Sequence, residues 1–233
     1  MYLPMYAFSR CRTALALVAA GALAAALAPA SLAAAPPVPG TAAPGTDYPC
    51  TQYLTAWAGK TVRSTWTFHI DAKGRPQQAK AVNLSAGNSP RSKCEGTVGS
   101  WGGKGSDGGH LIAATLKGVS KRINLVPQRH KINNGIYKWF ENGAKHCLSV
   151  KDMKVTNYTS TVHYPNATTV VPSSFTVSML PSKKGMKNTE ISLDIPNEDI
   201  SVQKESGLKR RLNNGLRANG CPTVKTLPPS SRH

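Results

Sequence analysis

Hydrophobic and polar positions alternate in several stretches of the chain, which is the pattern of half-buried β-strands. Thr61 to Ile70 predicts one strand, and Gln77 to Leu84 predicts its partner across the turn Asp71–Pro76. Together they predict an antiparallel hairpin. Alternation predicts three more strands after Cys147, separated by Pro-rich and Lys-Gly turns, at Tyr158–Tyr164, Phe175–Met179 and Ile191–Ile195.

One stretch has helical spacing instead. Between Lys131 and His146 the apolar residues fall at i, i+4, i+7 and i+8, which predicts an amphipathic helix. These residues are Ile132, Ile136, Trp139 and Phe140. Ser85–Gly109 is rich in glycine and is predicted to be a loop, and the last thirty residues are basic with no predicted element. One good helix among antiparallel strands indicates an α+β fold.

The N-terminus has the features of a secretory signal peptide. Arg10 and Arg12 precede an apolar run from Thr13 to Ala30, and small residues follow at Ser31–Ala35. The alternative is a permanent anchor, but this run is rich in alanine and shorter than the roughly 20 strongly apolar residues that a spanning helix prefers. The prediction is a signal peptide at 1–35, a disordered leader at 36–46, a single domain at 47–225 and a flexible tail at 226–233. The mature protein is predicted to be extracellular, without stable membrane association.

Basic residues strongly outnumber acidic ones. Without Arg10 and Arg12, 27 basic and 11 acidic side chains remain, a net charge of +16. Such a balance indicates a polyanionic partner, which leaves nucleic acid, anionic lipid and acidic wall polymers open.

Four cysteines remain after removal of the signal peptide with its Cys11: Cys50, Cys94, Cys147 and Cys221. An even number in an exported protein predicts two disulfides. Three pairings are possible, and we favour Cys50–Cys94 and Cys147–Cys221 because each joins nearby segments. The wide spacing does not fit a zinc site.

The centre of the chain carries polar residues at fixed offsets. It reads Asp107-Gly108-Gly109-His110, then Asn124-Leu125-Val126-Pro127-Gln128, then Asn133 and Glu141. This resembles the DNA/RNA non-specific endonucleases of the ββα-metal class, the His-Asn finger nucleases. Their signature is Asp-Arg-Gly-His, followed by Asn-x-x-Pro-Gln, an Asn and a Glu at matching steps. The resemblance covers roughly Ser106–Glu141 and implies a ββα-metal core, an antiparallel sheet with a metal-binding helix packed on it, with additional antiparallel strands.

The resemblance also implies roles for three residues. His110 is expected to be the general base, and a neutral imidazole can accept a proton from water at ordinary pH. Asn133 is expected to bind Mg²⁺ or Mn²⁺ directly through its amide oxygen. On a regular helix Asn133, Tyr137 and Glu141 share one row whose ends lie about 12 Å apart. Glu141 is therefore expected to hold the ion through a water molecule.

The remaining motif residues have predicted supporting roles. Asn124 is expected to assist catalysis by orienting the loop or the water network. Gln128, Arg122 and Arg129 are expected to contact the substrate phosphate. The chain departs from the signature at Gly108, where the resembling family has an arginine, so another cation is expected to substitute, with Arg122, Arg129 and Lys104 as candidates.

Two functions of different classes follow from this pattern. The first is a secreted, sugar-non-specific endonuclease that hydrolyses phosphodiester bonds in DNA and RNA, or a more restricted nuclease of the His-Asn finger group. The second is a non-catalytic, cationic protein that binds nucleic acid or another polyanion on the same fold. Chelator-sensitive digestion separates these functions.

Overall fold

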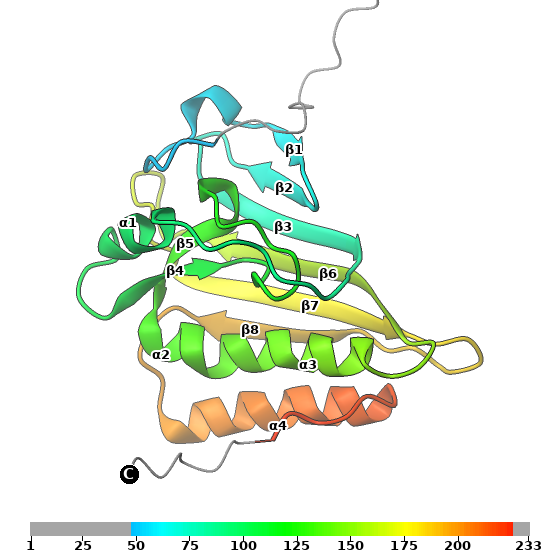
Figure 1. The fold of residues 1–233 in the computed structure, drawn as a ribbon. Helices are drawn as coiled ribbons and strands as arrows, with labels where there is room; N and C mark the ends of the chain where they lie inside the picture. The colour runs from blue at the N-terminus through cyan, green and yellow to red at the C-terminus, as the bar shows by residue number, and fades with distance from the viewer. Residues whose placement is uncertain (1–47, 226–233) are drawn as a thin grey trace, which may run out of the picture. The chain divides into compact units, whose positions relative to one another are not determined.

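The computed structural model describes residues 48–225 (Figure 1). The predicted signal peptide, the leader and the C-terminal tail lie outside the described residues. Within residues 48–225 no helix is long and apolar enough to cross a membrane.

A six-stranded antiparallel sheet is the largest element of the fold, with the order β1-β2-β3-β6-β7-β8. Its strands are β1 Thr61–Arg63, β2 Thr67–Ile70, β3 Pro76–Asn83, β6 Lys154–His163, β7 Ser174–Ser182 and β8 Ile191–Pro196. Alternate residues of β7 and β8 are buried, as the sequence pattern predicts; among them are Phe175, Val177, Met179, Leu193 and Ile195. The three strands predicted after Cys147 and the α+β fold class are confirmed.

The prediction of one strand from Thr61 to Ile70 is wrong. The chain reverses between Arg63 and Thr67, so that Val62 lies opposite Phe68 in an antiparallel pair. The amide of Ser64 donates to the carbonyl of Trp66 in this turn. Both short strands bury the same face of the sheet, so the alternation of the sequence continues through the turn and conceals it.

Two helices pack side by side against the sheet (Figure 1). The helix α3, Lys138–Leu148, contacts β6 and β7, and α4, Val202–Ala218, contacts β8 and α3. The apolar side of α3 lies in the core, where the ring of Phe140 is 5.6 Å from that of Tyr158. The predicted disulfide Cys147–Cys221 is present and joins the end of α3 to the segment after α4.

Helix α4 lies in a basic region for which the sequence predicts no element. This helix begins after Ser201, whose side chain accepts a hydrogen bond from the amide of Lys204. Leu208, Leu212 and Leu216 follow at i, i+4 and i+8, and the last two are fully buried. This narrow leucine row was a usable signal, although charged residues surround it.

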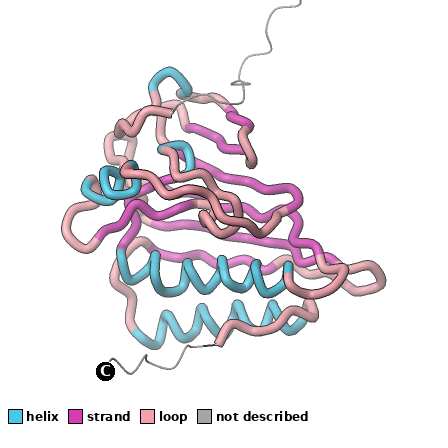
Figure 2. The backbone as a smooth tube through the Cα atoms, viewed as in Figure 1, coloured by secondary structure: helices cyan, strands magenta, loops and turns pink. Residues whose placement is uncertain are grey.

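A second, two-stranded sheet holds β4, Ser106–His110, against β5, Leu125–Arg129 (Figures 1 and 2). The short helix α1, Cys94–Ser100, packs on β4 and β5. The prediction of a loop over Ser85–Gly109 is therefore wrong for α1 and β4. The remaining short elements are the 3₁₀ turns Thr55–Trp57 and Arg122–Asn124, the helical turn α2 His130–Ile132, and the π-type turn Asn133–Tyr137.

Candidate active site

A cleft lies where β4 meets the segment that leads into α3. It consists of two adjoining hollows that share Arg91, Gly108, Asn133 and Asn134. His110, Lys138, Glu141 and Lys145 line the first hollow, and Glu95, Asp107 and His130 line the second. The structure thus brings together His110, Asn133 and Glu141, which the sequence motif places up to 31 positions apart.

His110 is the last residue of β4 and lies opposite Leu125 of β5. Its side chain is buried, with Nε2 at 2.9 Å from Oγ of Ser120. Burial lowers the pKa of His110 to about 4, while Glu95 raises it and Arg91 lowers it further. The imidazole is therefore neutral at neutral pH, as a general base requires.

Asp107 fixes the orientation of the Asn133 amide. The side-chain nitrogen of Asn133 donates to Oδ2 of Asp107 at 3.0 Å, and Asn134 donates to the same oxygen at 3.1 Å. Nδ1 of His130 lies 2.9 Å from this carboxylate as well. Because a carboxylate accepts and does not donate, the nitrogen of Asn133 faces Asp107 and its amide oxygen is left for another partner. No role for Asp107 follows from the sequence alone.

Glu141 lies in the first turn of α3 and lines the same hollow as Asn133. Burial raises the pKa of Glu141 to about 8. Three cations lower it: Lys138, Arg91 and Lys145. A further cation bound beside Glu141 would favour the charged form of its carboxyl group and so would lower its pKa.

The amide oxygen of Asn133 and the carboxylate of Glu141 fit a hard cation such as Mg²⁺, which prefers oxygen ligands and keeps several waters. The described residues contain no group of three or more His, Cys, Asp or Glu side chains that could hold a metal ion.

The expected helical row of Asn133, Tyr137 and Glu141 is wrong. The backbone leaves helical geometry at Gly135, with φ −98° and ψ −118°, so the segment bends before α3 begins. Tyr137 is fully buried and its hydroxyl lies beside Ser160 and the carbonyl of Leu111. The bend turns Tyr137 into the core while Asn133 and Glu141 face the cleft.

Asn124 and Gln128 are buried and do not line the cleft. Asn124 accepts from the amide of Ile112 and donates to the carbonyls of Ile112 and Val119, each at 2.9 Å. It thereby holds the loop that carries Ser120 to His110, one of the two roles expected of it, and a contact with the water network stays a prediction. The side chain of Gln128 lies against Gly109, and within residues 48–225 its amide has no hydrogen-bond partner. This burial argues against the predicted contact of Gln128 with phosphate.

The prediction that Arg122 contacts phosphate is wrong. Its side chain is fully buried, and its guanidinium donates to three backbone carbonyls. They belong to Thr51 at 2.9 Å, Gln52 at 2.8 Å and Leu125 at 2.6 Å. Arg122 therefore joins the N-terminal segment to β5, where these carbonyls compensate for the burial of its charge.

Arg129 and Lys104 are not among the residues that line the cleft. The guanidinium of Arg129 donates to the carbonyl of Lys104 at 3.0 Å and to Asp199 at 3.4 Å. Neither residue takes the place in the cleft that the missing arginine left.

Helix α1 explains the glycine at position 108. A Cβ atom on Gly108 would collide with the backbone carbonyl of Glu95, so no larger residue fits while α1 lies here. The same helix approach brings Arg91 and Glu95 to the cleft. Sequence reasoning missed both, because they lie in a stretch that was predicted to be a loop.

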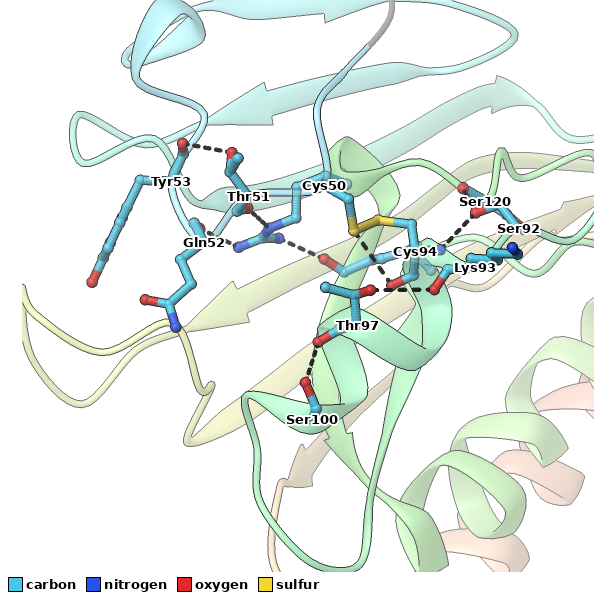
Figure 3. The surroundings of a disulfide bond; sticks show 12 residues. Cys50, Thr51, Gln52, Tyr53, Ser92, Lys93, Cys94, Thr97, Ser100 and Ser120 are labelled. Carbon is cyan, nitrogen blue, oxygen red and sulfur yellow. Dashed lines mark hydrogen bonds between the residues drawn. A yellow bond between two sulfur atoms is a disulfide. The ribbon is translucent and has the colours of Figure 1, made fainter.

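The start of α1 is anchored covalently. The predicted disulfide Cys50–Cys94 is present, with a Cα–Cα distance of 5.6 Å. Figure 3 shows this bond and, beside it, the hydroxyl of Ser92, which donates to the carbonyl of Ser120. The segment Arg91–Glu95 is thereby fixed to the N-terminal segment and to the loop that contacts His110.

Strand β4 ends at His110 and pairs antiparallel with β5, and the chain continues from β5 through the turn that holds Asn133 into α3, which holds Glu141. This arrangement is a ββα-metal nuclease core beside the larger sheet. A family model described as DNA/RNA non-specific endonuclease matches residues 56–181, more than half of the chain. The chain therefore belongs to this family.

Solved structures that match part of the chain include NucA from Streptococcus agalactiae. With magnesium bound, that structure is 22% identical, with 62% of this chain and 75% of that chain covered and a TM-score of 0.46. Without metal, it is 21% identical, with 57% and 70% covered and a TM-score of 0.44. No curated protein matches the chain.

Proposed function

We propose that this protein is a secreted endonuclease that hydrolyses phosphodiester bonds in DNA and RNA with little sequence preference. The observation that carries the proposal is that one cleft contains a neutral buried histidine, two oxygen groups that can bind a metal ion, and three cations. Phosphodiester hydrolysis needs an activated water and compensation of negative charge at phosphorus, and these groups supply both.

His110 acts as the general base that accepts a proton from the attacking water. Its burial favours the neutral form, so it is ready to accept a proton at pH 7. Its position at the end of β4, with Ser120 on one ring nitrogen, holds the imidazole in one orientation.

Asn133 would hold a Mg²⁺ or Mn²⁺ ion directly, and Glu141, which lines the same hollow, would act on that ion through water. A bound divalent ion compensates negative charge on the phosphate and on the leaving oxygen. Asp107 keeps the amide of Asn133 in the orientation that presents its oxygen.

Arg91, Lys138 and Lys145 bind the substrate phosphates, since all three line the hollow that contains His110. Arg91 takes the role for which the sequence had suggested Arg122, Arg129 or Lys104. Phosphate contacts carry no base information, so this arrangement suits cleavage of both DNA and RNA.

Export fits the two disulfides, which persist in oxidising compartments. Together with the predicted signal peptide, they support an extracellular site of action.

Digestion of plasmid DNA and ribosomal RNA, with Mg²⁺ and with excess EDTA, tests the proposal. We expect a smear of fragments from both substrates in Mg²⁺ and intact substrates in EDTA. Intact substrates in Mg²⁺ together with a retarded band would instead identify a non-catalytic cationic binder. Discrete fragments would identify a nuclease with restricted specificity.

A further inference from the structure

Glu95 places its two carboxylate oxygens on different partners. Oε2 pairs with Nε of Arg91 at 3.0 Å. Oε1 is buried, has no hydrogen-bond partner within residues 48–225, and lies 3.7 Å from Nε2 of His110. A buried carboxylate oxygen without a donor is costly, so this oxygen favours any nearby arrangement that turns an N–H toward it.

The hydrogen bond between His110 and Ser120 does not by itself decide which ring nitrogen carries the proton. The hydroxyl of Ser120 can accept from a protonated Nε2 or donate to an unprotonated one. In the first case Nδ1 has the free lone pair, and in the second case Nδ1 carries the proton and cannot act as a base.

Glu95 breaks this tie. Its negative oxygen attracts an N–H at Nε2 and repels a lone pair there, so the tautomer with the proton on Nε2 has the lower energy. No residue in the described part of the chain hydrogen-bonds Nδ1 of His110, and His110 lines the cleft. Nδ1 is thus the ring nitrogen that stays available to a water molecule.

We propose that Glu95 is a positioning residue that keeps the proton of His110 on Nε2, so that Nδ1 is the atom that accepts a proton from water. This inference rests on the proposed function, because it assigns the atom through which the general base acts.

A disulfide and a hydrogen bond hold Glu95 and Ser120 in place beside Nε2 of His110. Glu95 follows Cys94 of the Cys50–Cys94 disulfide, and the carbonyl of Ser120 accepts a hydrogen bond from Ser92 of the same segment. Both groups that contact Nε2 are therefore fixed relative to each other. The charged groups around His110 are Glu95 and Arg91 from the α1 side, and Lys138, Glu141 and Lys145 from α3.

The tautomer can be measured directly by ¹⁵N NMR of histidine-labelled protein without metal or substrate. We expect the wild type to carry its proton on Nε2. Glu95→Gln keeps the size of the side chain but removes its charge, and we expect the ratio of Nδ1–H to Nε2–H to rise about tenfold. Glu198→Gln is the matched control, because Glu198 pairs with Lys204 at an exposed site, and it should leave the ratio unchanged.

Ser120→Ala separates the two contacts of Nε2. If Glu95 decides the tautomer, this variant keeps the proton on Nε2. A wild type with its proton on Nδ1, an unchanged ratio in Glu95→Gln, or a change in Ser120→Ala alone would each overturn the proposal.

Cleavage assays supply a second readout. Glu95→Gln should lower kcat about 10- to 100-fold, the range known for removal of a group that orients a metal-binding side chain. A kcat equal to that of the wild type would contradict the inference. If the wild type cleaves nothing, the proposed function fails, whereas the NMR result on Glu95 is read independently of turnover.

Discussion

The side-chain nitrogen of Asn133 donates a hydrogen bond to Asp107 at 3.0 Å, which leaves the amide oxygen of Asn133 for a cation. This contact joins the signature segment before His110 to the turn before α3. The orientation of the proposed metal ligand thus depends on a residue that binds no metal itself.

Replacement of Asp107 should therefore weaken metal binding without removing a metal ligand. In Asp107→Ala the amide of Asn133 is free to rotate, and we expect the Mg²⁺ concentration for half-maximal cleavage to rise about 10- to 100-fold. The measurement is a Mg²⁺ titration of plasmid cleavage. Asp199→Ala is the control, because Asp199 pairs with Arg129 outside the cleft, and it should leave the titration unchanged. An equal titration for Asp107→Ala and the wild type would argue against this role.

Arg91 should contribute to binding of the phosphate backbone, whereas Arg129 should not. For Arg91→Ala we expect about tenfold weaker binding of a DNA oligonucleotide in EDTA, as for loss of a charged hydrogen bond. The dependence of this binding on salt should also fall, because each lost phosphate contact reduces the magnitude of the slope of log K against log salt by about 0.9. Arg129→Ala removes the same charge outside the cleft, and the reverse ranking of the two variants would refute the assignment.

The depressed pKa of His110 should be visible in the pH dependence of stability. The unfolded chain binds a proton at this histidine below about pH 6.5, but the folded protein binds it only near about pH 4. Stability should therefore fall as the pH drops from about 6.5 to 4, by up to about 3 kcal/mol from this residue.

Urea unfolding of the metal-free wild type and of His110→Gln over this range isolates the effect, because all other groups contribute to both. We expect the unfolding free energy of the wild type to fall relative to that of His110→Gln as the pH drops from about 6.5 to 4. A difference that stays constant from pH 7 to pH 4 would show that His110 titrates normally.

Gly108 should tolerate no side chain while α1 keeps its position. We expect Gly108→Ala to lower the free energy of unfolding by about 1–3 kcal/mol, because a Cβ atom collides with the carbonyl of Glu95. Gly96 lies in α1 itself with open space around it, so Gly96→Ala should be neutral or stabilise by up to about 1 kcal/mol. Urea unfolding of both variants is the measurement, and equal effects would contradict the steric account.

The sequence predicted features that depend on neighbouring residues or on a regular spacing along the chain. Alternation of apolar and polar residues predicted β3 and β6–β8. The fixed offsets of the motif marked His110, Asn133 and Glu141 as site residues, and the structure has all three in one cleft. The pairing of nearby cysteines gave both disulfides.

Features that depend on tertiary contacts could not be predicted. Arg91 and Glu95 reach the cleft only because α1 packs on glycines of β4, and no periodicity marks a seven-residue helix with two glycines. The charge of Arg122 suggested a phosphate ligand, but its partners are backbone carbonyls, which have no signature in sequence. Gly135 permits helix and bend alike, so the spacing around Tyr137 predicted a regular row.

The central claim is that His110 is the base in this cleft, and single-turnover cleavage by His110→Ala tests it most directly. The account predicts that cleavage of DNA and RNA in Mg²⁺ falls about 10²- to 10⁴-fold while binding of an oligonucleotide in EDTA stays the same. Cleavage at the rate of the wild type by His110→Ala would contradict the account.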